Sequence, residues 1–408
     1  MKDLSNKKVL FIICGGISAY KSLETIRMFR KNNAEIKTIL TKSAKEFVTP
    51  LSVASLSQGK VYDDLFSLEN ETEMDHISLS RWADVIIVAP ATANTISKLS
   101  QGNSDDLAST VILASNKQVF LVPAMNVRMW EHKATQKNLN TLIDYGYKFI
   151  GPEDGEMACG EYGKGKMSSP RQILSFLVRF FKKKDLLKSK KIKAIVTTGP
   201  TKEYIDPVRF ISNESSGKQG YEIALELKRL GIKTTLISGP TKLKYDSEIA
   251  VKRVVTAKQM LEAVKKKLPT HIAVCAAAVS DFKPLTLERN KIKKNQISEI
   301  KIEKNPDILS FLGKNNRFKP KLLVGFSAET ENLVKNSKIK MQDKLCDIMI
   351  ANDVSKKDRG FHSDSNEVLI IDKSGKIEKV KKNSKRFIAS IVAKKIIDTF
   401  LTNEKNLN

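Results

Sequence analysis

Cysteine and histidine are scarce in this sequence of 408 residues, with four of each. The cysteines, at positions 14, 159, 275 and 346, are too widely spaced for a disulfide framework or a metal cluster. This usage is typical of a reducing compartment, so we expect a cytoplasmic protein. Cys14, Cys275 and Cys346 lie in apolar surroundings and are predicted to be small buried residues.

Long apolar runs are also missing, and no segment reaches the roughly 20 residues needed to span a membrane. Residues 1–8 are polar and lead directly into a predicted strand, so we expect no signal peptide. The formal charge of +26 is spread along the chain without a zinc finger or a recognition helix. We therefore expect no nucleic-acid partner and no membrane partner, but a lysine-rich surface with local patches for phosphates.

The length suits two domains, and both halves predict a doubly wound α/β fold with Rossmann-like strand–turn–helix units. We expect the lysine-rich run Lys182–Lys193 to cover a helix end and a linker. The predicted domains are 1–188 and 189–408.

In the first half, short loops of small polar residues follow four predicted strands, at 8–13, 35–40, 84–89 and 119–122. Ligands of this fold class bind at the carboxyl ends of such strands. The first loop, Cys14–Lys21, opens a predicted helix whose free N–H groups suit an anion. A full G-x-G-x-x-G motif is absent, which favours a mononucleotide over NAD.

Five glycines between residues 151 and 167 argue against a helix or a central strand. We predict a surface loop, or flap, that carries Cys159. A mobile flap with an incidental cysteine is the simplest interpretation of this segment by itself. His76, just before a predicted helix at 77–83, is a second candidate, because imidazole exchanges protons near neutral pH.

The second half begins the same pattern again, with predicted strands at 192–198, 233–238, 271–277, 322–326, 347–351 and 368–371. Ser215, Ser216 and Lys218 precede a predicted helix and form a candidate phosphate cradle. The cations of the run 291–294 lie between Asp281 and Asp307, a pattern that suits a triphosphate with Mg²⁺.

Several motifs, in their order along the chain, resemble one bacterial family. In the first half these are Gly15–Lys21, His76, Ala89–Asn94, Pro123–Asn126 and Ala158–Gly160. In the second half they are Ile211–Asn213 with Ser215–Gly217, the run 291–294, Asn305–Asp307 and Gly325–Phe326. The chain resembles the bifunctional coenzyme A biosynthesis proteins, in which a flavin-dependent phosphopantothenoylcysteine decarboxylase is fused to a phosphopantothenate–cysteine ligase.

For the first domain, the resemblance implies FMN as a transient redox cofactor. Cys159 is then the implied proton donor, His76 the base or orienting group, and Asn126 the residue that holds the substrate carboxylate. The residues implied to bind FMN are Gly15, Gly16, Ser18, Thr41, Ser43, Thr92, Asn94 and Ser109.

For the second domain, the resemblance implies that 4′-phosphopantothenate reacts with CTP to give an acyl-cytidylate, which L-cysteine then attacks. Lys291 is the implied stabiliser of phosphate charge and Asn213 the residue that orients the acyl group, with Asp281 as a Mg²⁺ ligand. The residues implied to bind CTP are Ala276, Ala277, Asp281, Lys291, Asn305, Pro306, Asp307, Ile308, Phe326, Lys340 and Lys344. Spacing does not separate CTP from ATP.

The resemblance also implies a homo-oligomer, with trimeric flavin domains and dimeric ligase domains that together would close into a dodecamer. Lys166 stands where the family usually has arginine, and lysine cannot reproduce a bidentate arginine contact.

Two other interpretations remain open from the sequence. One is a flavin-dependent decarboxylase of peptidyl cysteine with an inactive second domain. The other is a non-catalytic basic protein that binds RNA.

Overall fold

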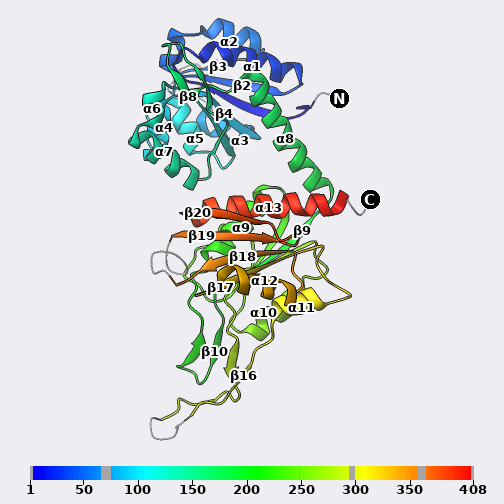
Figure 1. Ribbon diagram of the computed structural model, residues 1–408. Coiled ribbons are helices and arrows are strands. Elements are labelled where there is room, and N and C mark those ends of the chain that lie inside the picture. Colours follow the sequence, from blue (N-terminus) through cyan, green and yellow to red (C-terminus); the bar gives the residue numbers. More distant parts are fainter. Residues whose placement is uncertain (1–2, 66–74, 248, 294–298, 356–363, 406–408) are drawn as a thin grey trace. The chain divides into compact units, whose positions relative to one another are not determined.

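The computed structural model describes residues 3–65, 75–247, 249–293, 299–355 and 364–405. The chain divides into two compact units, residues Met1–Lys183 and Lys184–Asn408. Each unit is described below by itself (Figure 1).

The first unit contains a parallel sheet in the order β3-β2-β1-β4-β5-β6. Its strands are β1 (Lys8–Ile13), β2 (Glu35–Leu40), β3 (Val61–Tyr62), β4 (Val85–Ala91), β5 (Gln118–Pro123) and β6 (Lys148–Phe149). Its helices are α1 (Ala19–Lys31), the 3-10 helix η1 (Lys42–Glu46), α2 (Pro50–Ser57), α3 (Asp75–Trp82), α4 (Ala93–Gln101), α5 (Leu107–Leu113), α6 (Val127–Glu131), α7 (Lys133–Asp144) and α8 (Pro170–Ser189).

Both faces of this sheet are buried, because side chains alternate along each strand. Val9 and Phe11 of β1 belong to a cluster with residues of α1, α2 and α8. Leu10 and Ile12 point the other way, into a cluster with residues of α3, α4, α5 and α7. The continuous apolar strands are therefore explained by helices on both sides.

The second unit has an eight-stranded sheet in the order β13-β12-β9-β14-β17-β18-β19-β20, in which β19 pairs antiparallel with both β18 and β20. The sheet strands are β9 (Lys193–Thr198), β12 (Lys233–Ser238), β13 (Ala250–Arg253), β14 (Ile272–Cys275), β17 (Leu322–Glu329), β18 (Ile348–Asp353), β19 (Ser365–Asp372) and β20 (Ile377–Ser384). The helices are α9 (Lys218–Arg229), α10 (Ala257–Lys265), α11 (Ile308–Lys314), α12 (Leu333–Asp343) and α13 (Lys385–Lys405).

Two antiparallel strand pairs extend from this sheet as neighbouring arms (Figure 1). One arm consists of β10 (Lys202–Tyr204) and β11 (Phe210–Ser212), and the other of β15 (Phe282–Pro284) and β16 (Ile302–Lys304). The sequence patterns did not predict these short strands, because their apolar side chains lack a supporting core.

The doubly wound α/β prediction is confirmed for both units. The run Lys182–Lys193 covers a helix end, as expected, because α8 continues to Ser189 and β9 begins at Lys193. Leu187, which belongs to the second unit, is fully buried in the core of that unit. The lysines of this helix end occupy the polar face of an amphipathic helix, a pattern that charge counting alone did not reveal. No helix in the described part of the chain is long and apolar enough to cross a membrane.

Candidate active sites

The first candidate site lies at the carboxyl ends of β1, β2, β4 and β5. The loops after β1 and β2 pack closely there, since a Cβ on Gly15 would lie 2.5 Å from Ser43 Cβ. Only glycine allows this approach. A Cβ on Gly16 would lie 3.8 Å from Thr92 Cγ2, after β4. Residues implied to bind FMN thus come together from three separate segments.

Some polar side chains of this site already cap a helix, whereas others do not. Thr92 caps α4, Ser109 joins Asp106 in a capping box on α5, and Asn126 caps α6. In the described chain, however, neither Ser18 at the start of α1 nor Thr41 at the start of η1 uses its hydroxyl as a helix cap. These two hydroxyls are therefore the ones suited to a phosphate group at the start of α1.

Asn126 is oriented by its own helix. Its Oδ1 accepts a hydrogen bond of 2.8 Å from the main-chain N–H of Met129. The amide NH₂ group consequently points away from the helix end and remains a donor. A donor at this position suits a carboxylate.

The glycine-rich segment is neither a helix nor a central strand, as expected, but it is a β-hairpin rather than the expected surface loop. Strands β7 (Glu153–Glu156) and β8 (Tyr162–Lys166) pair antiparallel with a register shift, and Cys159 lies exposed in the connection between them. The strand glycines Gly155, Gly163 and Gly165 have φ angles of 150° to 158°, a backbone conformation that residues with a side chain rarely adopt. Glycine is poor in a central strand, but it is tolerated in an isolated two-stranded ribbon with a bulge.

The hairpin rests on the loop that contains Asn126. Met125 N–H donates to the Gly165 carbonyl at 3.1 Å, and a Cβ on Gly165 would lie only 2.3 Å from the Met125 carbonyl oxygen. Gly163 packs in the same way against Val127. The pairing therefore attaches the Cys159 hairpin to the Asn126 loop.

Lys21 is a residue to which the sequence motifs gave no role. Its burial and the neighbouring charge of Lys166 lower the pKa of its ammonium group. Two neighbouring cations repel each other, and an anion bound near both would relieve this repulsion. The motif Gly15–Lys21 contained this residue, but only the fold brings Lys166 near it.

His76 lies inside α3 rather than before the helix, and α3 packs against α5, which carries Ser109. Among the described residues, His76 forms no hydrogen bond with another candidate group. Asn94 is exposed in the first turn of α4.

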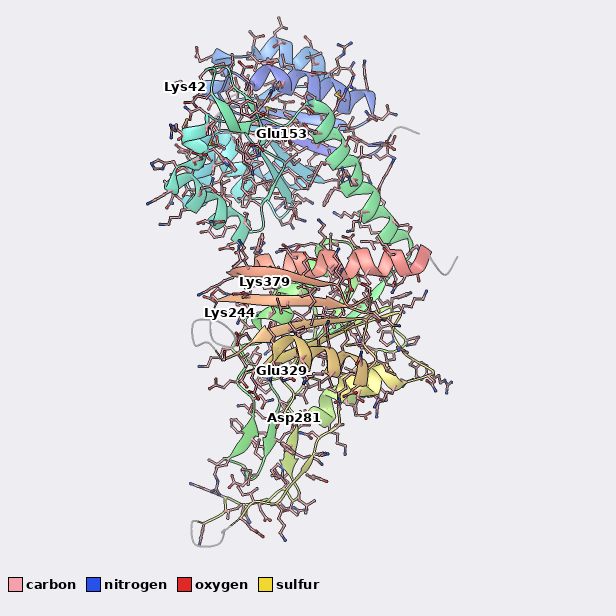
Figure 2. All side chains as sticks on the ribbon, viewed as in Figure 1. Lys42, Glu153, Lys244, Asp281, Glu329 and Lys379 are labelled. Atoms are coloured by element: carbon pink, nitrogen blue, oxygen red, sulfur yellow. The ribbon has the colours of Figure 1, made fainter. Side chains whose placement is uncertain are left out.

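The second candidate site is an open cleft of about 680 Å³ at the carboxyl ends of β14 and β17. Asn213 lines this cleft, together with every residue implied to bind CTP except one: Ala276, Ala277, Asp281, Asn305, Pro306, Asp307, Ile308, Phe326, Lys340 and Lys344. Asp281, labelled in Figure 2, lies where the β15–β16 arm begins. The exception is Lys291, which is exposed on that arm and is absent from the cleft lining. Lys294 lies outside the described residues.

Charged side chains are arranged at one end of the cleft. Lys344 Nζ contacts Asp307 Oδ2 at 2.6 Å, and Asp307 also caps α11. Burial tends to raise the pKa of Asp307, but the contacts with Lys344 and the Ser310 N–H, and the charge of Lys340, lower it overall. Because Asp307 is ionised, it neutralises only part of the positive charge here, which leaves a site suited to phosphate.

The amides in the cleft are held by main-chain carbonyls. Asn213 donates to the Val279 carbonyl at 3.0 Å, and Asn305 donates to the Ser280 carbonyl at 2.9 Å. Within the described residues, the buried Asn305 Oδ1 has no hydrogen-bond partner. Such an unsatisfied acceptor in a cleft suits a ligand that brings a donor.

The cysteines outside the hairpin do not suit nucleophilic chemistry. Burial raises the pKa of Cys14 and of Cys275 to about 12, and that of Cys346 to about 11. Cys275 lines the cleft but is therefore a neutral thiol. In the described part of the chain, no three histidine, cysteine or acidic side chains converge as a metal cluster would require.

Two family models match the chain. Residues 1–182 match the Flavoprotein family, and residues 189–400 match the DNA/pantothenate metabolism flavoprotein C-terminal domain. The coenzyme A biosynthesis bifunctional protein CoaBC of Haemophilus influenzae is 41% identical over 97% of this chain and 98% of its own length. That of Vibrio vulnificus is 39% identical over the same shares of both chains. A solved C-terminal domain of such a protein is 32% identical and covers 52% of this chain and 96% of its own, with a TM-score of 0.45.

Proposed function

The chain belongs to the family of coenzyme A biosynthesis bifunctional proteins, and from this premise we propose how its two units divide the chemistry. The family combines phosphopantothenate–cysteine ligation with phosphopantothenoylcysteine decarboxylation, and this chain has both activities. The observation that carries the assignment is the identity over 97% of the chain, which includes both units. We assign ligation to the second unit and decarboxylation to the first.

In the first unit, we propose FMN as the flavin. The hydroxyls of Ser18 and Thr41, which cap no helix in the described chain, would hold its phosphate together with Ser43 and the N–H groups at the start of α1. Gly15 and Gly16 allow its close approach, and Thr92, Asn94 and Ser109 would border its ring. When bound, FMN supplies a two-electron oxidation of the substrate thiol and later returns the electrons, so that the carboxylate can leave as CO₂.

The residues of the chain would then bind and orient the substrate, move its protons and exclude water. Asn126 would hold the substrate carboxylate through its amide NH₂, which the cap on Met129 directs outward. His76 would accept or orient the thiol proton, and Cys159 would donate its Sγ proton to the carbon that loses CO₂. The hairpin that carries Cys159 would exclude water while the substrate is in its reactive form. Lys21 and Lys166 would bind an anionic group of the substrate.

In the second unit, we propose that the cleft binds CTP. Lys340 and Lys344 would contact the phosphates, and Asn305 Oδ1 would accept from the exocyclic amine of the base. Adenine also has such an amine, so the preference for CTP rests on the family. Asp281 would bind Mg²⁺ together with phosphate oxygens, since Mg²⁺ sites commonly use one or two carboxylates and the substrate's phosphates.

The ligase chemistry would proceed in two steps. The carboxylate of 4′-phosphopantothenate attacks the α-phosphorus of CTP and pyrophosphate leaves, with Lys291 stabilising the developing charge. The amine of L-cysteine then attacks the acyl carbon and CMP leaves, with Asn213 orienting the acyl group. Asn213 suits this role because its contact with Val279 fixes its amide.

We also propose a cytoplasmic homo-oligomer. Large apolar side chains are exposed on the two arms of the second unit, namely Tyr204, Val208, Phe210, Phe282, Leu285, Leu287, Ile300 and Ile302. A second copy of the unit would cover them. In the first unit, Ile17 and Tyr20 are exposed beside the proposed FMN residues, which supports a trimer with FMN near the subunit contacts.

One assay tests the proposed division. Purified protein is incubated with 4′-phosphopantothenate, L-cysteine, CTP and Mg²⁺, and the products are followed by mass. We expect 4′-phosphopantetheine, CMP and pyrophosphate. Accumulation of phosphopantothenoylcysteine would mean that the first unit is inactive. Decarboxylation of supplied phosphopantothenoylcysteine without any ligation would contradict the role of the second unit and favour the peptidyl-cysteine alternative.

A further inference from the structure

Asp206 joins two segments that are far apart in the sequence. It lies in the turn between β10 and β11, and its side chain is fully buried. Its Oδ1 accepts hydrogen bonds of 2.8 Å from the N–H groups of Val208 and Arg209, which define the turn. These two bonds alone would give Asp206 a structural role within the β10–β11 turn.

The second oxygen of Asp206 reaches across to the other arm. Asp206 Oδ2 accepts from Arg209 Nε at 2.9 Å and from the main-chain N–H of Ile292 at 3.3 Å. Arg209 Nη2 in turn donates to the Ile292 carbonyl at 2.9 Å. Both main-chain polar groups of Ile292 are therefore held by the Asp206–Arg209 ion pair, in which the carboxylate is buried and the arginine is partly exposed.

A third contact reinforces this arrangement. The Glu288 N–H donates to the Ile205 carbonyl at 3.0 Å, so residues 288 and 292 are both attached to the β10–β11 turn. Lys291 lies between these attachment points. Its segment would otherwise be a long connection between β15 and β16 with many accessible conformations.

We propose that Asp206 is a positioning residue for the ligase reaction, acting through the main chain of Ile292 on the segment that carries Lys291. This inference rests on the role proposed above for Lys291. Because residues 288 and 292 are attached to the β10–β11 turn, the main chain at Lys291 is held in place relative to the two arms. Less conformational entropy is then lost when Lys291 binds the phosphates of the nucleotide. Asp206 itself touches neither substrate nor nucleotide.

The Asp206→Asn variant separates the two roles of this side chain. An asparagine keeps the Oδ1 acceptor for the turn, but it places an NH₂ group where Oδ2 accepted from Arg209 and Ile292. We expect pyrophosphate release from CTP and 4′-phosphopantothenate to slow by about 10- to 100-fold in kcat, with little change in KM. Glu288→Gln is the matched control, because it removes a carboxylate from the same segment that contributes only its main-chain N–H.

Two further measurements identify the route of the effect. Trypsin should cut after Lys291 faster in Asp206→Asn than in the unchanged protein or in Glu288→Gln. In a Lys291→Ala background, Asp206→Asn should cause no further loss, because both changes would remove the same contribution. Decarboxylation of supplied phosphopantothenoylcysteine should stay unchanged in all variants, because the changes are confined to the second unit. The nearly unchanged KM for CTP in Asp206→Asn would show that the second unit still folds.

The possible failures are distinct. Full ligase activity in Lys291→Ala would overturn the proposed role of Lys291 and, with it, positioning through Lys291. A loss in Lys291→Ala with normal rates in Asp206→Asn would overturn the inference about Asp206 alone. Additive losses in the double variant would show that Asp206 acts by another route.

Discussion

The six parallel strands of each unit follow the same order, but the two units build their candidate sites in different ways. In both, the order reverses between two parallel strands, β1 and β4 in the first unit and β9 and β14 in the second. Ligands in this fold class bind at such a point. The loops that leave these strands account for the difference.

In the first unit the loops are short, and helix caps fix many of the polar side chains. Thr92, Ser109 and Asn126 each occupy a cap or capping box. In the second unit the cleft is open, and its amides are held by carbonyls of distant loops, as in the contact from Asn213 to Val279. Local structure therefore orients the first site, whereas contacts between distant segments orient the second.

The largest expected effect separates the two units completely. Cys159→Ser should slow decarboxylation by about 10²- to 10⁴-fold, because a serine hydroxyl is a much weaker acid than a thiol. Ligation should continue at its normal rate, so phosphopantothenoylcysteine accumulates in the mass-resolved assay. FMN should remain bound, which its absorption band would report. Normal turnover to 4′-phosphopantetheine would remove Cys159 from its proposed role.

The four thiols should differ strongly in reactivity. At pH 8, burial leaves only about one part in ten thousand of Cys14 and Cys275 as thiolate, given pKa values of about 12. Cys159 is exposed and should be alkylated by iodoacetamide first, with Cys346 (pKa about 11) far slower. Peptide mapping over time gives the order. Early labelling of Cys275 would mean that the cleft opens more deeply than described.

Replacing Lys344 should weaken CTP binding, an effect confined to the second unit. Lys344→Met removes a cation from the cleft and should raise KM for CTP by about tenfold, equivalent to ~1.4 kcal/mol. Lys338→Met is the matched control, since Lys338 is exposed on α12, the helix that Lys344 follows as C-cap, and lies outside the cleft lining. Equal effects of the two changes would indicate general loss of positive charge rather than a contact with the nucleotide.

The contact between the Cys159 hairpin and the Asn126 loop leads to a prediction of smaller effect for the first site. Gly165→Ala would place a Cβ 2.3 Å from the Met125 carbonyl oxygen, so the hairpin must shift. We expect a stability loss of about 1–3 kcal/mol and decarboxylation reduced about threefold to tenfold. Gly59→Ala, whose Cβ would meet only the Ile36 oxygen at 3.6 Å, serves as control. An unchanged rate would show that the hairpin position does not limit the reaction.

The smallest effect concerns acid stability of the second unit. Burial tends to raise the pKa of Asp372, but its contact with Lys395 at 2.8 Å and the hydrogen bond from Ser374 lower it to about 2. A depressed carboxylate pKa stabilises the folded state above about pH 4, and this contribution disappears as the pH falls toward 2. Asp372→Asn should lower stability at pH 7 by at most about 1 kcal/mol. The difference should vanish near pH 2 in thermal unfolding, and a constant difference would contradict the ionic explanation.

Much of the fold could be predicted because its signals are local. Apolar runs such as Lys8–Ile13 followed by glycine and small polar residues indicate buried parallel strands with ligand loops at their ends. The residues implied for the CTP cleft also came together, except for Lys291. Ala276 and Ala277 follow β14, Phe326 belongs to β17, and the others come from the end of the β15–β16 arm and from α12. The arms and the hairpin were missed, because short ribbons depend on what they pack against and not on periodicity.

The sequence by itself determined the two doubly wound sheets, the positions of the loops and, through its motifs, the family. Only the tertiary structure decided that Lys166 approaches Lys21, that the Cys159 hairpin pairs with Met125, and that Asp206 holds Ile292. It also left Lys291 out of the cleft lining. The physical reason is that strand and loop signals arise between neighbours in sequence, whereas these contacts join residues far apart along the chain and exist only once the sheets are packed.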